Sequence, residues 1–174
     1  RRGCTGFTFH IRCVGTLFCQ ALNKPGVPGV RTCFWASGPY SGDPYLNVAW
    51  PDTNTYYWGA KFTMPEGSKL TIEGQYPHSR YMSFISYDEA GRPIESVADY
   101  LVKPKAGSAN PFLAGADRNG TSRDYSLDVV DGRPDPSIKT GMNLVGQTRE
   151  KLNTPKYGPA PGQQTILYRI YVID

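Results

Sequence analysis

The chain has 174 residues and a formal net charge of +4, and its 12 tyrosines, 19 glycines and 15 prolines stand beside only 20% charged residues. Tyr packs well on a half-buried strand while Gly and Pro interrupt helical hydrogen bonding, so this mixture favours short strands and turns over long helices. The basic residues form no run and no stretch approaches the roughly 20 apolar residues of a transmembrane helix, so we expect no nucleic-acid partner and no membrane span.

Alternation of apolar and polar residues, the pattern of a half-buried strand, first appears at residues 7–13. Residues 35–54 are rich in Gly, Pro, Ser and Asp and predict a long irregular loop, interrupted by a short apolar run at 46–50. From residue 55 onward the alternation returns in several segments separated by turn residues. These predicted strands cover residues 56–63, 69–76, 81–87, 96–102, 123–130 and 165–173.

Two of these segments have the pattern of central strands. Residues 81–87 tolerate apolar side chains on both faces, and residues 165–173 are rich in β-branched and aromatic residues and contain neither Pro nor Gly. Residues 104–120 predict a loop, and residues 131–164 lack periodicity apart from a short helical turn near 137–144.

The spacing of short strands and turns predicts an all-β fold. We expect a single β domain over residues 1–174, an antiparallel β-sandwich or jelly roll with long loops. Its core would be residues 35–174, preceded by a cysteine-stapled N-terminal segment at residues 1–34. An open barrel is the nearest alternative.

The cysteines predict the compartment. An even number of them in a loop-rich segment favours two disulfides in an oxidising environment, in any of three pairings. Reduced buried thiols and a zinc site are the alternatives, but zinc sites usually contain cysteines separated by about two to four residues, and no such pair occurs here. We therefore expect a secreted or extracytoplasmic protein. The cysteines are Cys4, Cys13, Cys19 and Cys33.

Two further features agree with secretion. The chain opens with Arg-Arg-Gly-Cys and has neither an initiator Met nor an apolar signal region, as expected of a processed chain. Asn119 begins an Asn-Gly-Thr sequon and is the candidate glycosylation site.

The turn between the predicted strands 69–76 and 81–87 concentrates functional side chains. His78 is the candidate general acid or base, with Tyr81 and Asp88 as the other candidate catalytic residues. Arg80 is the candidate clamp for a substrate carboxylate. The alternative is a tight structural turn in which His78 caps backbone groups and Arg80 pairs with an acidic side chain.

Further ligand-binding candidates are phenols near this turn and side chains of the loop at 107–112, because long loops often cover a site. They are Tyr76, Tyr87, Asn110 and Phe112. The standard nucleotide-binding, nucleophile-elbow and zinc-protease motifs are absent, and the chain has only two histidines. We therefore expect no metal and no cofactor.

Four short motifs carry a family resemblance. A Tyr-Trp-x-Ala strand, a YPHxRYxSF strand, a GSxNPF loop and a closing YRxY strand occur in the order shared by a group of uncharacterised secreted proteins from actinobacteria and related sources, which this chain resembles. It is more distantly similar to the jelly-roll domain called DUF1214. The resemblance implies a β-sandwich and an extracytoplasmic setting and brings no activity, and the cysteine-rich start departs from the group's pattern. The motifs lie at residues 57–60, 76–84, 107–112 and 168–171.

Three functions fit these residues. The first is an extracytoplasmic binding module for a carbohydrate or a small carboxylated ligand. The second is a lyase or hydrolase that uses His78 and Tyr81 with Arg80 as the substrate clamp. The third is a structural subunit of a surface or extracellular assembly, which would self-associate.

Overall fold

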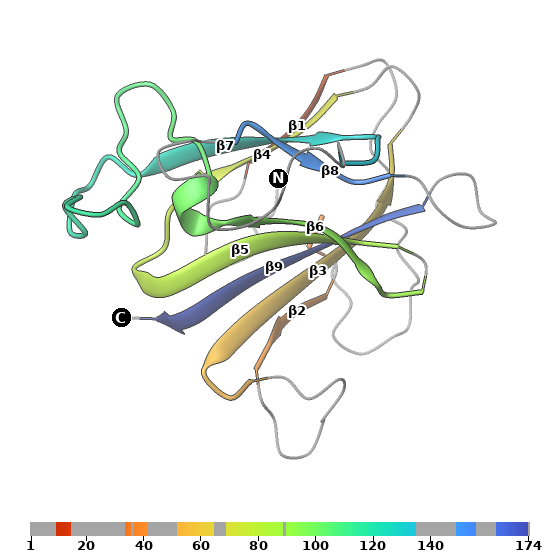
Figure 1. The fold of residues 1–174 in the computed structure, drawn as a ribbon, viewed down its shortest axis with the longest axis horizontal. Helices are drawn as coiled ribbons and strands as arrows, with labels where there is room; N and C mark the ends of the chain where they lie inside the picture. Colours follow the sequence, from red (N-terminus) through yellow and green to blue (C-terminus); the bar gives the residue numbers. More distant parts are fainter. Residues whose placement is uncertain are drawn as a thin grey trace.

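The structure is a computed structural model, and the part it describes forms two β-sheets that lie face to face (Figure 1). This confirms the predicted all-β class. The described residues contain nine strands and a single helical element, the 3-10 turn η1 (Asp99–Leu101). None of their helices is long and apolar enough to cross a membrane. The described residues are 10–14, 34–35, 37–41, 52–64, 69–88, 90–134, 149–155 and 163–173.

The smaller sheet has four strands in the order β1-β4-β7-β8. Its pairs β1–β4 and β4–β7 are antiparallel, whereas β8 runs parallel to β7. The strands are β1 (His10–Val14), β4 (Lys69–Gln75), β7 (Asp124–Val130) and β8 (Lys151–Asn153).

The larger sheet has five strands in the order β2-β3-β9-β5-β6, and all its pairs are antiparallel. Both strands predicted to be central have a neighbour on each side, because β9 lies between β3 and β5, and β5 between β9 and β6. The strands are β2 (Ser37–Tyr40), β3 (Thr55–Thr63), β5 (Ser79–Tyr87), β6 (Pro93–Ala98) and β9 (Gln163–Ile173).

The core fills the space between the sheets. Alternate residues of β5 and β9 point inward, and among them Phe84 and Tyr168 stack with ring centroids 4.7 Å apart. Phe84 also meets Tyr125 of the other sheet, edge to face at 6.0 Å. Leu127 of β7 is fully buried on the same side. Each such side chain contributes about 1.5–3 kcal/mol by leaving water, so this layer holds the two sheets together.

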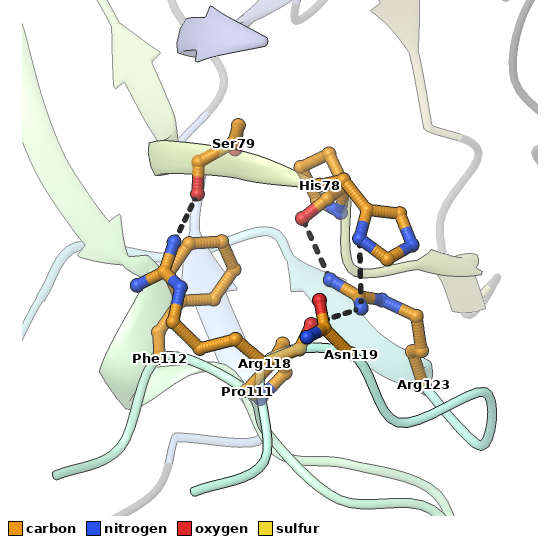
Figure 2. A pocket seen from close by; sticks show the side chains of 8 residues that line it. His78, Ser79, Pro111, Phe112, Arg118, Asn119 and Arg123 are labelled. Atoms are coloured by element: carbon orange, nitrogen blue, oxygen red, sulfur yellow. Dashed lines mark hydrogen bonds between the residues drawn. The ribbon is translucent and has the colours of Figure 1, made fainter. Parts of the chain in front are cut away.

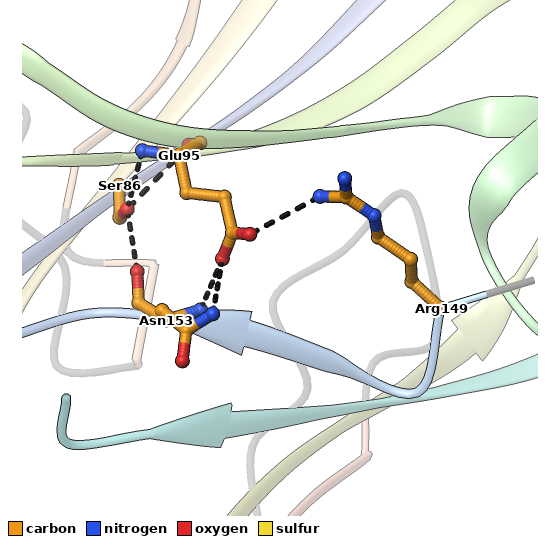
Figure 3. Close-up of polar contacts among 4 residues, drawn as sticks. All are labelled: Ser86, Glu95, Arg149 and Asn153. Atoms are coloured by element: carbon orange, nitrogen blue, oxygen red, sulfur yellow. Dashed lines mark hydrogen bonds and ion pairs between the residues drawn. The ribbon is translucent and has the colours of Figure 1, made fainter. Parts of the chain in front are cut away.

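A buried polar network joins the edges of the two sheets (Figure 3). Glu95 of β6 accepts hydrogen bonds from the backbone and side-chain nitrogens of Asn153 in β8, at 2.6 and 2.9 Å, and forms an ion pair with Arg149 at 3.1 Å. Ser86 of β5 donates to the Asn153 carbonyl at 2.7 Å. Strands β6 and β8 belong to different sheets, so the network closes one side of the core.

The sequence missed or misplaced the shortest elements. Strands β2 and β8 lie in stretches that were predicted to be irregular, and they hold only four and three residues. The strand predicted at 96–102 begins earlier, as β6, and turns into η1 at Asp99. There the Asp99 carboxylate accepts the backbone N–H groups of Tyr100 and Met82, at 2.7 and 3.3 Å, which ends the strand.

Several predictions fall outside the described residues. They are the apolar run at 46–50, the helical turn near 137–144 and the positions of Cys4, Cys19 and Cys33. Cys13 lies in β1, where the strand pairing but not the side chain is described. The disulfide-stapled segment therefore stays a prediction.

Candidate functional site

The candidate site lies at a corner where the chain passes from one sheet to the other. Residues 76–78 connect β4 of the four-stranded sheet to β5 of the five-stranded sheet. Strand β4 pairs with β7, and Arg123 directly precedes β7, so its backbone carbonyl accepts the N–H of Tyr76 at 2.9 Å. Strand pairing thereby brings His78 and Arg123 together across 45 residues of sequence.

Arg123 holds this corner through its guanidinium, which is buried with its residue only 6% exposed. Nε donates to the Tyr76 carbonyl at 2.8 Å and Nη2 to the Pro77 carbonyl at 2.9 Å. Nη1 donates to the carbonyl of Arg118 at 2.7 Å, which ties the loop before β7 to the same corner. Burial lowers the pKa of Arg123, the positive charge of Arg118 lowers it further, and Asp117 acts in the opposite direction.

His78 contacts this guanidinium with one ring nitrogen (Figure 2). Its Nδ1 lies 3.3 Å from Nη1 of Arg123. An arginine can only donate, so Nδ1 accepts and the proton of the neutral ring sits on Nε2. The residue is exposed, and its Nε2–H is therefore a donor available to a ligand.

A cavity of about 250 Å³ opens beside these side chains (Figure 2). Its lining contains two arginines and a histidine and no carboxylate. Arg118 is oriented by a 2.6 Å hydrogen bond from Nη2 to the Ser79 carbonyl and by the Phe112 ring, whose centroid is 5.6 Å from its Cζ. The lining residues are Pro77, His78, Ser79, Pro111, Phe112, Arg118, Asn119 and Arg123.

Asn110 anchors the loop that supplies much of this lining. Its Nδ2 donates to the carbonyls of Asp99 and Val102 at 2.8 and 3.0 Å, and its Oδ1 accepts the Phe112 N–H at 2.9 Å. The side chain was predicted to bind ligand, but the residue is only 2% exposed and its amide is committed to these bonds. It positions Phe112, which does line the cavity.

Tyr76 is likewise a supporting residue in this structure. It is 1% exposed, its hydroxyl donates to the Val102 carbonyl at 2.5 Å, and its ring packs edge to face on Phe112. Burial raises the pKa of the phenol, and the negative charge of Asp99 adds to the effect. The phenol thus stays protonated and holds the loop against the corner.

The remaining predicted residues lie away from the cavity. Arg80 is exposed at the start of β5, and Tyr81 and Tyr87 project from the outer face of the five-stranded sheet. Asp88 lies past the far end of β5, where it pairs with Arg92 at 2.7 Å. The nine residues of β5 span roughly 30 Å, so His78 and Asp88 are not brought together.

Arg118 and Arg123 are the site residues that sequence reasoning missed. The predicted strand 123–130 began with Arg123, but nothing in the local pattern linked that strand to the His78 turn. Alternation of apolar and polar residues could have revealed this link. It makes the segment at 69–76 a pairing partner for 123–130, and the ends of paired strands meet, which places Arg123 beside the His78 turn. Asn119, the candidate glycosylation site, is exposed and lines the same cavity.

Comparisons with family models, with curated proteins and with solved structures give no match to this chain. The resemblance to secreted β-sandwich proteins and to the DUF1214 domain therefore stays a prediction. Within the described part of the chain, no group of three or more His, Cys, Asp or Glu side chains could hold a metal ion. The charged and titratable side chains that line the cavity are Arg118, Arg123 and His78.

Proposed function

We propose that the chain is an extracytoplasmic β-sandwich binding module that holds a small carboxylated ligand in the cavity between His78 and Arg118. The observation that carries the proposal is the lining itself. Two guanidinium groups and an imidazole converge on one concave surface, and none of the eight lining residues is acidic. Arginine and a neutral histidine both present N–H donors, which a carboxylate can accept.

The electrostatics of the corner favour an anion. Burial lowers the pKa of Arg123 and the positive charge of Arg118 lowers it further, so a carboxylate between the two guanidinium groups would offset their repulsion. Arg123 commits most of its donors to backbone carbonyls and so contributes mainly its field. Arg118 commits one donor to Ser79 and keeps others for a ligand, so it is the residue expected to clamp the carboxylate.

The size of the cavity limits the ligand. A volume of about 250 Å³ equals roughly eight water molecules in the liquid and is smaller than the pockets that enclose drug-sized molecules. The Phe112 ring offers one apolar wall for a short carbon chain. A short dicarboxylate such as succinate fits these properties and is the probe of choice.

Binding is favoured over the lyase or hydrolase alternative by the placement of the candidate catalytic residues. Tyr81 lies on the outer face of the sheet and Asp88 past the far end of β5, so neither assists His78. The Nδ1 atom of His78 is also occupied by Arg123. His78 is therefore a hydrogen-bond donor to a ligand in this proposal.

Calorimetric titration with succinate, and with neutral succinamide as its matched control, tests the proposal. Succinate should bind and succinamide should not. Arg118→Gln should weaken succinate binding by roughly tenfold or more, because a charge-assisted hydrogen bond is lost. Arg80→Gln removes the same charge from a residue outside the cavity and should change the affinity by less than about twofold. Equal binding of succinate and succinamide, or equal losses in both variants, would contradict the proposal.

A further inference from the structure

A second cluster of functional side chains lies on the outer face of the five-stranded sheet. Strand register places Tyr57, Arg169 and Ser83 side by side on β3, β9 and β5. Tyr81 and Tyr171 pair in the same way. These positions alternate with buried core residues, so they project away from the core. This cluster lies on the broad face of the sheet, whereas the cavity lies at the corner before β5.

The guanidinium of Arg169 is held in a defined place within this cluster. Its Nε donates to the Ser83 hydroxyl at 2.8 Å. Its Cζ lies 5.5 Å from the ring centroid of Tyr81 and 5.7 Å from that of Tyr171, in cation-π contact with both. The two rings themselves meet edge to face at 5.8 Å. Such stacking fixes the plane of the guanidinium and leaves the donors of its Nη end for a ligand.

Arg169 differs from Arg92 and Arg149 in its lack of a counter-ion among the described residues. Arg92 pairs with Asp88 and Arg149 with Glu95. Within the described ranges no carboxylate forms an ion pair with Arg169, although its side chain is half-buried. Tyr87 also lies within range of its charge, since Arg169 lowers the pKa of this phenol against the larger raising effect of burial. A fixed and partly desolvated cation among phenols is complementary to an anion that also has an apolar face.

We propose that this tyrosine–arginine face binds an acidic pyranose, the uronic acid unit of a polysaccharide. The carboxylate would accept hydrogen bonds from the Nη end of Arg169. The tyrosine rings would contact the C–H faces of the sugar, and their hydroxyls would bond to the sugar hydroxyls. A phosphate polymer fits less well, because nucleic-acid surfaces combine many cations and this cluster has one. The tyrosine–arginine face is formed by Tyr57, Tyr81, Tyr87, Arg169 and Tyr171.

Titration of the full chain with tetragalacturonate and with neutral tetragalactose tests this inference. The acidic oligosaccharide should bind at least roughly tenfold more tightly than the neutral one. Arg169→Gln should remove that preference and reduce binding of the acid by roughly tenfold or more. Lys151→Gln removes the same charge from the edge of the other sheet and should change binding by less than about twofold.

The folded state of each variant is confirmed by its circular dichroism spectrum before titration. If Arg169→Gln lowers the melting temperature, Arg169→Lys provides the second measurement, because it keeps the charge but loses the planar fork and should also lose the preference. Failure of tetragalacturonate to bind the wild-type chain would overturn the inference, and so would equal loss in the Lys151 variant. Succinate binding in the cavity is unaffected by either outcome, so the two proposals fail separately.

Discussion

The guanidinium of Arg123 donates the hydrogen bonds that backbone carbonyls at the corner before β5 would otherwise need from water. A chain that crosses between two sheets leaves carbonyl groups that no strand partner satisfies, and the guanidinium supplies donors to those of Tyr76, Pro77 and Arg118. A single buried cation thereby fixes the backbone of the turn and the ring of His78. The hydrogen bonds that satisfy the backbone carbonyls of the turn therefore also position the candidate site.

Asn110 plays the equivalent part for the loop that follows η1. Asn110→Ala removes two donors from buried carbonyls and one acceptor from the Phe112 N–H, so we expect the free energy of unfolding to fall by about 2–3 kcal/mol. Chemical denaturation measures the change. Asn119→Ala is the matched control, since Asn119 is exposed in the same loop and should change stability by less than about 0.5 kcal/mol. Similar losses in both variants would show that Asn110 does not anchor the loop.

At this scale the sequence predicted part of the site. His78 and Phe112 were identified because a histidine at a turn and an aromatic in a long loop are visible locally, and both line the cavity. Asn110 and Tyr76 were assigned to ligand binding because polarity alone does not reveal burial. Arg118 was not predicted as a site residue, because its position depends on how the loop before β7 folds back onto the corner before β5.

Most of the longer strands could be predicted from the alternation of apolar and polar residues. The predicted strands at 56–63, 69–76 and 81–87 correspond to β3, β4 and β5, because a sheet with one buried face imposes a two-residue period. Strands β2 and β8 could not be found in this way, since three or four residues contain too little of that period. Tertiary pairing, rather than local pattern, makes them strands.

The network of Glu95, Arg149 and Asn153, which joins the edges of the two sheets, leads to a separate prediction. Glu95→Gln removes the charge that Arg149 faces, and both side chains are largely buried, at 5% and 12% exposure. We expect the free energy of unfolding to fall by about 3 kcal/mol, because a buried charge loses its partner. Denaturant titration checks this value.

Glu150→Gln is the control for that substitution. Glu150 pairs with Lys103 at the surface, with side chains 65% and 49% exposed, so its loss should change stability by about 0–1 kcal/mol. A loss of the same size in Glu95→Gln would mean that the network of Glu95, Arg149 and Asn153 does not hold β6 to β8.

For the whole molecule, the two sheets place arginines on different surfaces. The formal charge of +4 is modest, and the positions of the individual arginines matter more than their sum. Arginines that form no ion pair among the described residues lie at the corner before β5, where Arg118 and Arg123 line the cavity, and on the outer face, where Arg169 lies among tyrosines. These are the two positions at which we propose that anionic ligands bind.

The measurement that tests the central claim most directly is a proton–nitrogen correlation spectrum of the isotope-labelled chain during titration with succinate. Binding in the cavity should shift the backbone signals of His78, Ser79, Arg118 and Asn119 in a saturable way, with one dissociation constant for all of them, and leave those of β8 in place. Unchanged signals at these residues, or shifts that begin elsewhere in the sheet, would contradict a carboxylate site at this corner.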